Sequence, residues 1–248
     1  MKETRILMGM PVTVEVADAG VTAASLEVVF GYFRYVDGKF STYQDNSEIS
    51  LINQGALPVE QASMDMRTIF ALAEQTKQAT NGYFDIRRNG IYDPSGVVKG
   101  WAIAHAAGML RQAGFKNYYV DAGGDIQAAG KNSHGQDWRV GIRNPFNMQE
   151  IVKVLHVSEC GVATSGTYVR GQHIYSPKND AESLKEIVSL TVVAPDIYDA
   201  DRFATAAFAM GTTGILFIEQ LAGCEGYMIN AQGRATFTSG FARYIYHD

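Results

Sequence analysis

The chain is poor in cysteine, with only Cys160 and Cys224. Neither cysteine has a second cysteine or a histidine at the short spacing that zinc sites use, which argues against a zinc site. Thiols this sparse suit a reducing compartment, where they stay free. A single disulfide between the two cysteines remains compatible with the sequence.

The chain also lacks an excess of positive charge and a long apolar run. It has 21 Lys and Arg residues against 26 Asp and Glu residues, a net charge of -5, so a broad nucleic-acid surface is not expected. No apolar stretch reaches the length of a membrane span. Thr13 and Glu15 interrupt the apolar residues near the N-terminus, which therefore do not resemble a signal peptide, and no cysteine follows that could carry a lipid anchor. These absences predict a cytoplasmic protein.

What is present is typical of a globular domain. Hydrophobic residues make up 46% and charged residues 19% of the 248 positions, enough to build a substantial core. We expect a single domain over residues 1–248. Strand and helix patterns are partly segregated along the chain, which favours an α+β fold over a doubly wound sheet.

Periodicity assigns the main elements. Helical spacing predicts helices over residues 20–40, 64–82, 97–114, 201–210 and 214–222. Alternation and turn residues predict strands over 4–16, on both sides of Gly123-Gly124, and over 138–145, 150–159, 161–177 and 186–195, with two or three more in 225–247. Residues 41–55 read as a loop with a short helix start, where Ser47 and Ser50 offer capping groups, and residues 83–96 read as a connecting loop.

Two glycine-containing segments could approach a ligand closely. "VDAGGDIQAAG" (120–130) has no GxGxxG pattern and is followed by a strand, so a tight turn is the more common explanation. "DPSGVVKGWA" (93–102) leads into a helix, where Gly96 could present a backbone group and Lys99 could offset negative charge. It lacks the Walker pattern, and an ordinary capped helix start with a solvated lysine is the more common case.

Two further segments carry candidate chemistry. "GVATSGTYVRGQHIYSP" (161–177) contains His173, a natural general base near neutral pH, although a lone strand histidine is more often structural. Ser165 lacks the GxSxG surroundings of a nucleophile. In "DIYDADRFATAAFAMG" (196–211), Asp201 and Thr205 share one helix face, and their oxygens suit Mg²⁺. The alternative is that the acidic residues only cap the helix.

Together these segments indicate a protein family more specifically than any one of them does alone. In order along the chain they read "MGM", "STYQDNSEIS", "GYFD", "DPSGVVKGWA", "AGGDI", "TSGTY", "HIYSP" and "ADRFAT". Their order and content resemble the ApbE family, the FAD:protein FMN transferases. The resemblance implies an ApbE-like, T-fold-related fold: a two-lobed single domain of mixed or antiparallel sheets with flanking helices.

The resemblance also implies an activity. Members of the family use Mg²⁺ to cleave the pyrophosphate of FAD and attach FMN through a phosphoester to a Thr or Ser hydroxyl of an acceptor protein, releasing AMP. By this resemblance Asp201, Thr205 and the carbonyl of Gly96, in the loop before the lysine helix, are the magnesium ligands. His173 takes the proton of the acceptor hydroxyl. The residues expected to contact FAD are Met8, Tyr43, Tyr83, Phe84, Asp85, Asp93, Lys99 and Tyr175.

The chain departs from the family pattern beside the histidine. The usual H-I-I-D-P reads "HIYSP", so Ser176 replaces an aspartate that would orient the His173 imidazole. Two alternatives to the transferase therefore remain. One is a Mg²⁺-dependent FAD pyrophosphatase that uses water and yields FMN and AMP, and the other is a non-catalytic FAD-binding protein. Acceptors in the family carry a short Thr- or Ser-containing flavinylation motif, and the sequence does not identify the acceptor of this chain.

Overall fold

The computed structural model describes residues 1–166, 177–178 and 185–246. Its centre is an eight-stranded sheet in the order β1-β2-β5-β6-β9-β10-β11-β12, in which each described pair of neighbours is antiparallel. The strands are β1 (Lys2–Leu7), β2 (Met10–Val16), β5 (Tyr118–Ala122), β6 (Asp125–Ala129), β9 (Cys160–Gly166), β10 (Ile187–Ala194), β11 (Glu225–Asn230) and β12 (Ala235–Phe237).

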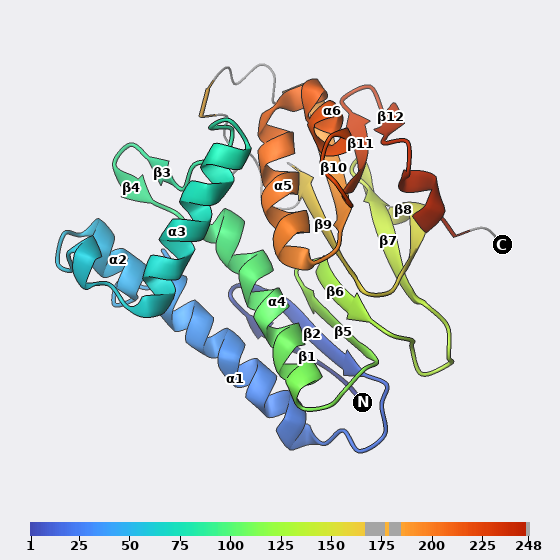
Figure 1. Ribbon diagram of the computed structural model, residues 1–248, viewed down its shortest axis with the longest axis horizontal. Helices are drawn as coiled ribbons and strands as arrows, with labels where there is room; N and C mark the ends of the chain where they lie inside the picture. The colour runs from blue at the N-terminus through green and yellow to red at the C-terminus, as the bar shows by residue number, and fades with distance from the viewer. Residues whose placement is uncertain (167–176, 179–184, 247–248) are drawn as a thin grey trace.

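Helices cover one face of this sheet, the face toward the viewer in Figure 1. They are α1 (Ala23–Phe40), α4 (Ser95–Gln112), α5 (Ile197–Ala209) and α6 (Gly214–Glu219). Their buried apolar side chains form one large core with the strand residues that face them. α2 (Glu48–Asn53) and α3 (Met64–Ala79) lie beyond the sheet, beside α1 and α4.

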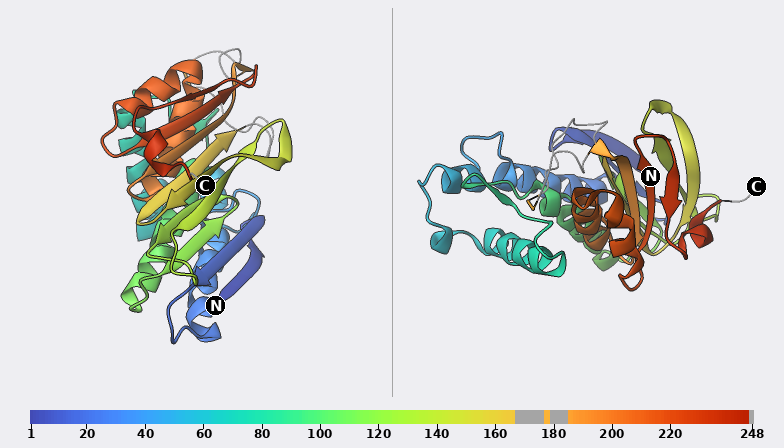
Figure 2. Two further views of the ribbon diagram at one scale, coloured as in Figure 1. Left: turned by 90° about the vertical axis from the view of Figure 1, so that its right-hand side faces the viewer. Right: turned by 90° about the horizontal axis from the view of Figure 1, so that it is seen from above.

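A long β-hairpin covers the opposite face. It consists of β7 (Trp138–Asn144) and β8 (Asn147–Val157), and the two views of Figure 2 show it on the side of the sheet away from α1 and α4. Every second residue of β7 is buried, because alternate side chains of a strand point to the same face. These residues and their partners on β6, β9, β10 and β11 form a second, separate core.

Short polar residues begin the helices. The side chain of Thr22 accepts a hydrogen bond from the Ser25 amide at the start of α1, and Ser63 does the same for Met66 in α3. The predicted capping role of Ser47 is confirmed, since its hydroxyl accepts from the Ser50 amide. Asp196 caps α5 by accepting from the amide of Asp199, as its position suggested.

The prediction of one continuous strand over residues 4–16 was wrong in one respect. Met8 and Gly9 have φ values of 54° and 71°, so the chain turns there and the two halves pair as the hairpin β1–β2. Methionine rarely adopts a positive φ, and a single glycine such as Gly9 also occurs within strands, so one continuous strand was predicted. Met8 and Gly9 thus place this tight turn at the edge of the sheet.

Two helices begin earlier than the sequence predicted. α4 starts at Ser95 rather than residue 97, and α5 starts at Ile197 rather than Asp201. The connecting loop over 83–96 contains a small hairpin, β3 (Arg87–Arg88) with β4 (Ile91–Tyr92). Single 3₁₀ turns occupy Val59–Gln61, Gly211–Thr213 and Phe241–Tyr244.

The predicted α+β class is confirmed, with antiparallel sheets and flanking helices. The strands expected over 138–145, 150–159 and 186–195 are present with small shifts at their ends. The strand expected over 161–177 is described as far as Gly166, and most of its remainder lies outside the described residues.

Candidate active site

The helices α4 and α5 meet at Gly100 and Asp201. The amide of Gly100 donates a hydrogen bond of 2.8 Å to Oδ2 of Asp201, and the Asp201 side chain is almost fully buried. A Cβ atom on Gly100 would lie 2.8 Å from Cβ of Asp201 and 2.9 Å from the carbonyl oxygen of Ile197. Only glycine therefore allows the two helices to approach this closely, and the approach brings a carboxylate onto the backbone of α4.

A half-buried lysine on α4 connects α5 to the sheet. Lys99 Nζ forms a close ion pair with Oδ2 of Asp125, the first residue of β6, and lies 3.6 Å from Oδ1 of Asp201. Asp125 is 2% exposed and Asp201 is 3% exposed, so both carboxylates are held out of water. Carboxylates buried to this degree are costly unless they are paired with cations.

The charges of these three groups do not balance, because two carboxylates share one ammonium group. Burial raises the pKa of the Asp201 carboxyl well above its usual range, while Lys99 opposes this shift and the charge of Asp125 adds to it. With both carboxylates ionised, these three groups at the junction of α4 and α5 carry two negative charges against one positive charge, and an additional cation would offset the difference.

Thr205 and Gly96 lie beside this carboxylate. Thr205 is one turn beyond Asp201 on α5, so both side chains share a helix face. A Cβ atom on Gly96 would lie 3.4 Å from Cγ2 of Thr205 and 3.1 Å from Cε2 of Phe84, so all three residues meet at the start of α4. The residues predicted as magnesium ligands are thus brought together by α4 and α5.

The placement of Gly96 corrects one detail of the prediction. Gly96 lies in the first turn of α4 and not in the loop before it. In a regular helix the amide of Gly100 points at the carbonyl of Gly96, four residues earlier. The amide of Gly100 donates a hydrogen bond to Asp201 Oδ2, which places this carboxylate against the first turns of α4, near Gly96.

These residues fit a magnesium ion better than a transition metal. A carboxylate, a hydroxyl and a carbonyl are hard oxygen donors, and two carboxylates that share one ammonium group would favour a divalent cation. Within the part of the chain that the structure describes, no group of three or more His, Cys, Asp or Glu side chains could hold a metal. A site here would therefore use a single carboxylate with neutral oxygen donors and leave room for substrate oxygens.

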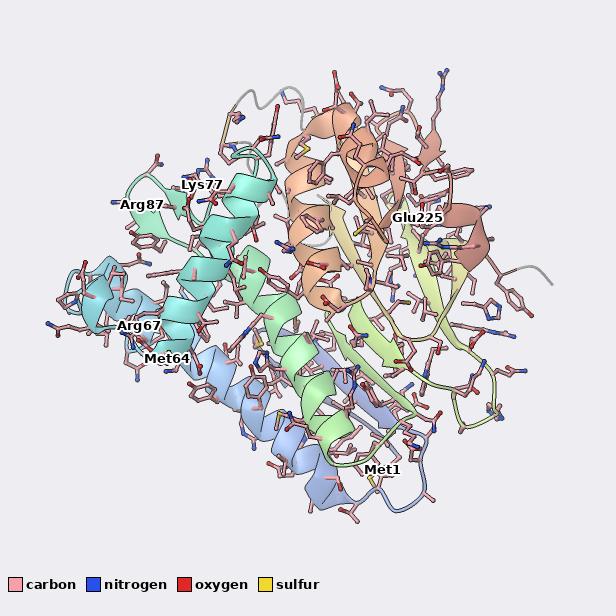
Figure 3. All side chains as sticks on the ribbon, viewed as in Figure 1. Met1, Met64, Arg67, Lys77, Arg87 and Glu225 are labelled. Carbon is pink, nitrogen blue, oxygen red and sulfur yellow. The ribbon has the colours of Figure 1, made fainter. Side chains whose placement is uncertain are left out.

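The segment after α3 lies next to the start of α4. Phe84 is buried against Gly96, and the Tyr83 ring faces the Nζ atom of Lys178 at 5.1 Å. Asp85 Oδ2 accepts a hydrogen bond of 2.7 Å from Lys77, and its Oδ1 accepts one of 2.8 Å from the amide of Arg87. Figure 3 labels Lys77 at the end of α3 and Arg87 on the β3–β4 hairpin.

The other predicted FAD contacts are more scattered. Met8 occupies the β1–β2 turn and packs partly against the main core. Asp93 Oδ1 accepts a hydrogen bond of 3.0 Å from the Ser95 amide and so helps to start α4. Tyr43 is 96% exposed in the loop after α1, so its ring is not part of a preformed pocket. His173 and Tyr175, together with Ser176, lie outside the described residues.

Asp125 is the residue at this site that the sequence analysis did not select. The GGD segment was read as a turn, and it is one: Gly123 and Gly124 have φ values of 65° and 98° between β5 and β6. The available signal was a carboxylate at the start of a strand whose five residues are all buried. A carboxylate in such a strand needs a partner, and that partner is Lys99.

A separate cavity of about 400 Å³ lies along the second half of α4. Its described lining comprises Ala104, Ala107, Gly108, Arg111, Gln127, Glu159, Pro195, Asp196 and Tyr198. This lining shares no residue with the predicted metal ligands or FAD contacts. It mixes acidic and basic side chains, so its charge does not favour one class of ligand.

Among the described residues, no helix combines the length and the apolar character that crossing a membrane requires.

The model of the ApbE family matches residues 8–92 and 90–228. A protein from Salmonella typhimurium named FAD:protein FMN transferase is 31% identical over a region that covers 57% of this chain and 43% of that protein. A Haemophilus influenzae protein of the same name is 25% identical, with 92% of this chain and 87% of that protein covered.

The fold has a close structural counterpart. The flavin transferase ApbE from Vibrio cholerae superimposes with a TM-score of 0.83 at 22% identity, covering 98% of both chains. The fold predicted from the sequence resemblance is thereby confirmed. Because the family model matches most of its length, this chain belongs to the ApbE family.

Proposed function

We propose that this protein is a Mg²⁺-dependent transferase that moves FMN from FAD to a Thr or Ser hydroxyl of an acceptor protein. The observation that carries the proposal is the junction of α4 and α5, where Asp201 is buried beside Thr205 and Gly96 within an excess of negative charge. Membership of the ApbE family and the names of the Salmonella and Haemophilus relatives support it.

The reaction exchanges one phosphorus–oxygen bond for another. The acceptor hydroxyl oxygen attacks the phosphorus on the FMN side of the FAD pyrophosphate. The bond from that phosphorus to the bridging oxygen breaks, and AMP leaves with that oxygen. The hydroxyl proton passes to a base, for which we propose His173. Such a displacement requires in-line positioning, neutralisation of charge and a proton acceptor.

The residues of the α4–α5 junction would provide the neutralisation. Asp201, the Thr205 hydroxyl and the Gly96 carbonyl would hold a magnesium ion, which when bound supplies positive charge to the pyrophosphate oxygens. The Gly100 amide holds the Asp201 carboxylate by the hydrogen bond to Oδ2 and so fixes its direction. Lys99 adds a second positive charge close to the same position.

The FAD molecule would lie over the start of α4. Phe84 is buried beneath Gly96 and gives this position an apolar floor, and Tyr83 follows from the same segment. We propose that Met8, Tyr43, Asp85, Asp93 and Tyr175 complete the contacts. Because Tyr43 is almost fully exposed, it would close over the ligand rather than form a preformed wall.

An incubation of the protein with FAD, Mg²⁺ and a candidate acceptor domain tests the proposal. We expect a fluorescent acceptor whose mass has increased by one FMN less one water, together with AMP in equal amount. Free FMN and AMP with an unlabelled acceptor would instead show a pyrophosphatase. FAD that stays intact under all conditions would show a binding protein without the chemistry.

A further inference from the structure

Lys99 is shared unequally between two carboxylates that come from different parts of the fold. Its Nζ atom forms a close ion pair with Asp125 on β6 and is 3.6 Å from Asp201 on α5. The interaction with Asp125 is the shorter one by a wide margin. The ammonium group therefore lies against the sheet, beside the position at which we place the metal.

Asp125 is fixed more firmly than its lysine partner. It is 2% exposed, and its Oδ1 accepts a hydrogen bond of 3.1 Å from the amide of Thr164 on the neighbouring strand β9. It also begins a strand that pairs on both sides, with β5 and with β9. Lys99, by contrast, has a flexible four-carbon stem. The position of the carboxylate therefore decides where the ammonium group rests.

This position has a consequence for a cation at Asp201. An ammonium group and a divalent cation compete for the same carboxylate, because each is attracted to it and the two repel each other. Without Asp125, Lys99 would find its nearest buried carboxylate in Asp201, which is already within 3.6 Å. The lysine would then occupy the side of Asp201 that the metal needs.

We propose that Asp125 is a positioning residue that withdraws the Lys99 ammonium group from Asp201 and so leaves this carboxylate available to a divalent cation. The inference rests on the proposed metal site and adds a determinant of its affinity. Asp125 need not touch the metal or the substrate, since it acts through Lys99.

The test measures metal affinity directly and not turnover. Mn²⁺ serves as the probe, its free concentration is followed by electron paramagnetic resonance with and without FAD, and Mg²⁺ is added as competitor. We expect Asp125→Asn to raise the dissociation constant for Mn²⁺ by roughly tenfold or more. Without FAD, Lys99→Met should bind Mn²⁺ at least as tightly as the wild type, because the competing ammonium group is gone.

The double variant separates action through Lys99 from a direct effect of charge. If Asp125 acts through the lysine, adding Asp125→Asn to Lys99→Met should change the dissociation constant by no more than about twofold. An equal loss of affinity in both backgrounds would overturn the inference. So would weaker binding by Lys99→Met alone, a result that remains readable even if Asp125→Asn does not fold.

Asp121 provides the matched control. It lies on the same β5–β6 hairpin, but Asp125 pairs with Ala122 and shares its face of the sheet, whereas Asp121 points to the opposite face. Its Oδ1 accepts a hydrogen bond of 2.8 Å from the Gly124 amide. Asp121→Asn removes the same charge, and we expect it to change Mn²⁺ affinity by less than about threefold.

The outcomes distinguish this inference from the proposed function. Failure of the wild type to bind Mn²⁺, with and without FAD, would refute the metal site itself. Binding by the wild type that Asp125→Asn leaves unchanged would refute only the role of Asp125. A loss in Asp121→Asn as large as that in Asp125→Asn would also refute it, because the effect would then be one of general charge.

Discussion

The two faces of the central sheet are packed in different ways. On the helical face, the core includes an ion-paired group of Lys99, Asp125 and Asp201 beside the backbone of Gly100. On the opposite face, the β7–β8 hairpin closes a core formed by apolar and aromatic side chains. Burying charged groups costs free energy, whereas burying apolar groups is favourable. The ion-paired group therefore makes the helical face less stable than an apolar core of the same size would be.

This difference predicts that substitutions on the two faces should separate function from stability. Changes that remove a charge at the junction should reduce activity while leaving the folded state intact. Changes in the apolar core behind the sheet should reduce stability while leaving the activity of the folded molecules intact. Four substitutions test this, from the largest expected effect to the smallest, and a fifth, Gly108→Ala, serves as a control.

Asp201→Asn should have the largest effect. The amide retains the shape of the side chain and can still accept from Gly100, but it loses the charge that would hold the cation. We expect the rate of AMP release from FAD to fall roughly 10²- to 10³-fold. The melting temperature should be unchanged or higher, because the folded protein no longer buries that charge. Wild-type turnover at saturating Mg²⁺ would contradict the assignment.

Leu155→Ala tests the opposite face. Leu155 is fully buried between the hairpin and the sheet, and its truncation leaves a cavity. We expect a loss of about 2–5 kcal/mol in the free energy of unfolding, measured by urea denaturation. The kcat per folded molecule should stay at the wild-type value. A large fall in kcat at a temperature where the variant is folded would show that the two faces are coupled.

Gly100→Ala should affect both properties. The added methyl group would lie 2.8 Å from Cβ of Asp201, so α4 and α5 must separate. We expect a loss of about 1–3 kcal/mol in stability, with weaker Mn²⁺ binding, measured by denaturation and by electron paramagnetic resonance.

Gly108→Ala is the control on the same helix. No atom lies within 4 Å of its added Cβ, so the variant should be neutral or gain up to about 1 kcal/mol from helix propensity. Equal behaviour of the two variants would show that the contact at Gly100 does not matter.

Apart from the control at Gly108, Trp138→Phe should have the smallest effect. Trp138 Nε1 donates a hydrogen bond of 2.8 Å to the carbonyl oxygen of Ala129 within the second core. Phenylalanine retains most of the apolar contact and removes this donor. We expect a loss of about 1–2 kcal/mol in stability, measured by thermal unfolding, and no change in FAD turnover.

The sequence predicted the local parts of the site well. The spacing of Asp201 and Thr205 places them on one face of any helix, and the cap at Asp196 follows from side-chain chemistry. The family resemblance linked these residues to Gly96, and the structure brings the three together.

Contacts between distant segments could not be predicted in this way. Gly100 and Asp201 are 101 positions apart, and their hydrogen bond depends on how α4 and α5 pack. The pairing of Lys99 with Asp125 depends on the same packing, so Asp125 was read only as part of a turn. The turn at Met8 and Gly9 was not predicted because methionine is not a typical turn residue and a single glycine also occurs within strands.

The central claim is that the charged junction of α4 and α5 holds the catalytic metal. An anomalous difference map from crystals grown with Mn²⁺ in place of Mg²⁺ tests it most directly. The account predicts a peak within coordination distance of the Asp201 carboxylate and the Thr205 hydroxyl, on the helical face of the sheet. A Mn²⁺ peak elsewhere in the molecule, with none at this junction, would contradict it.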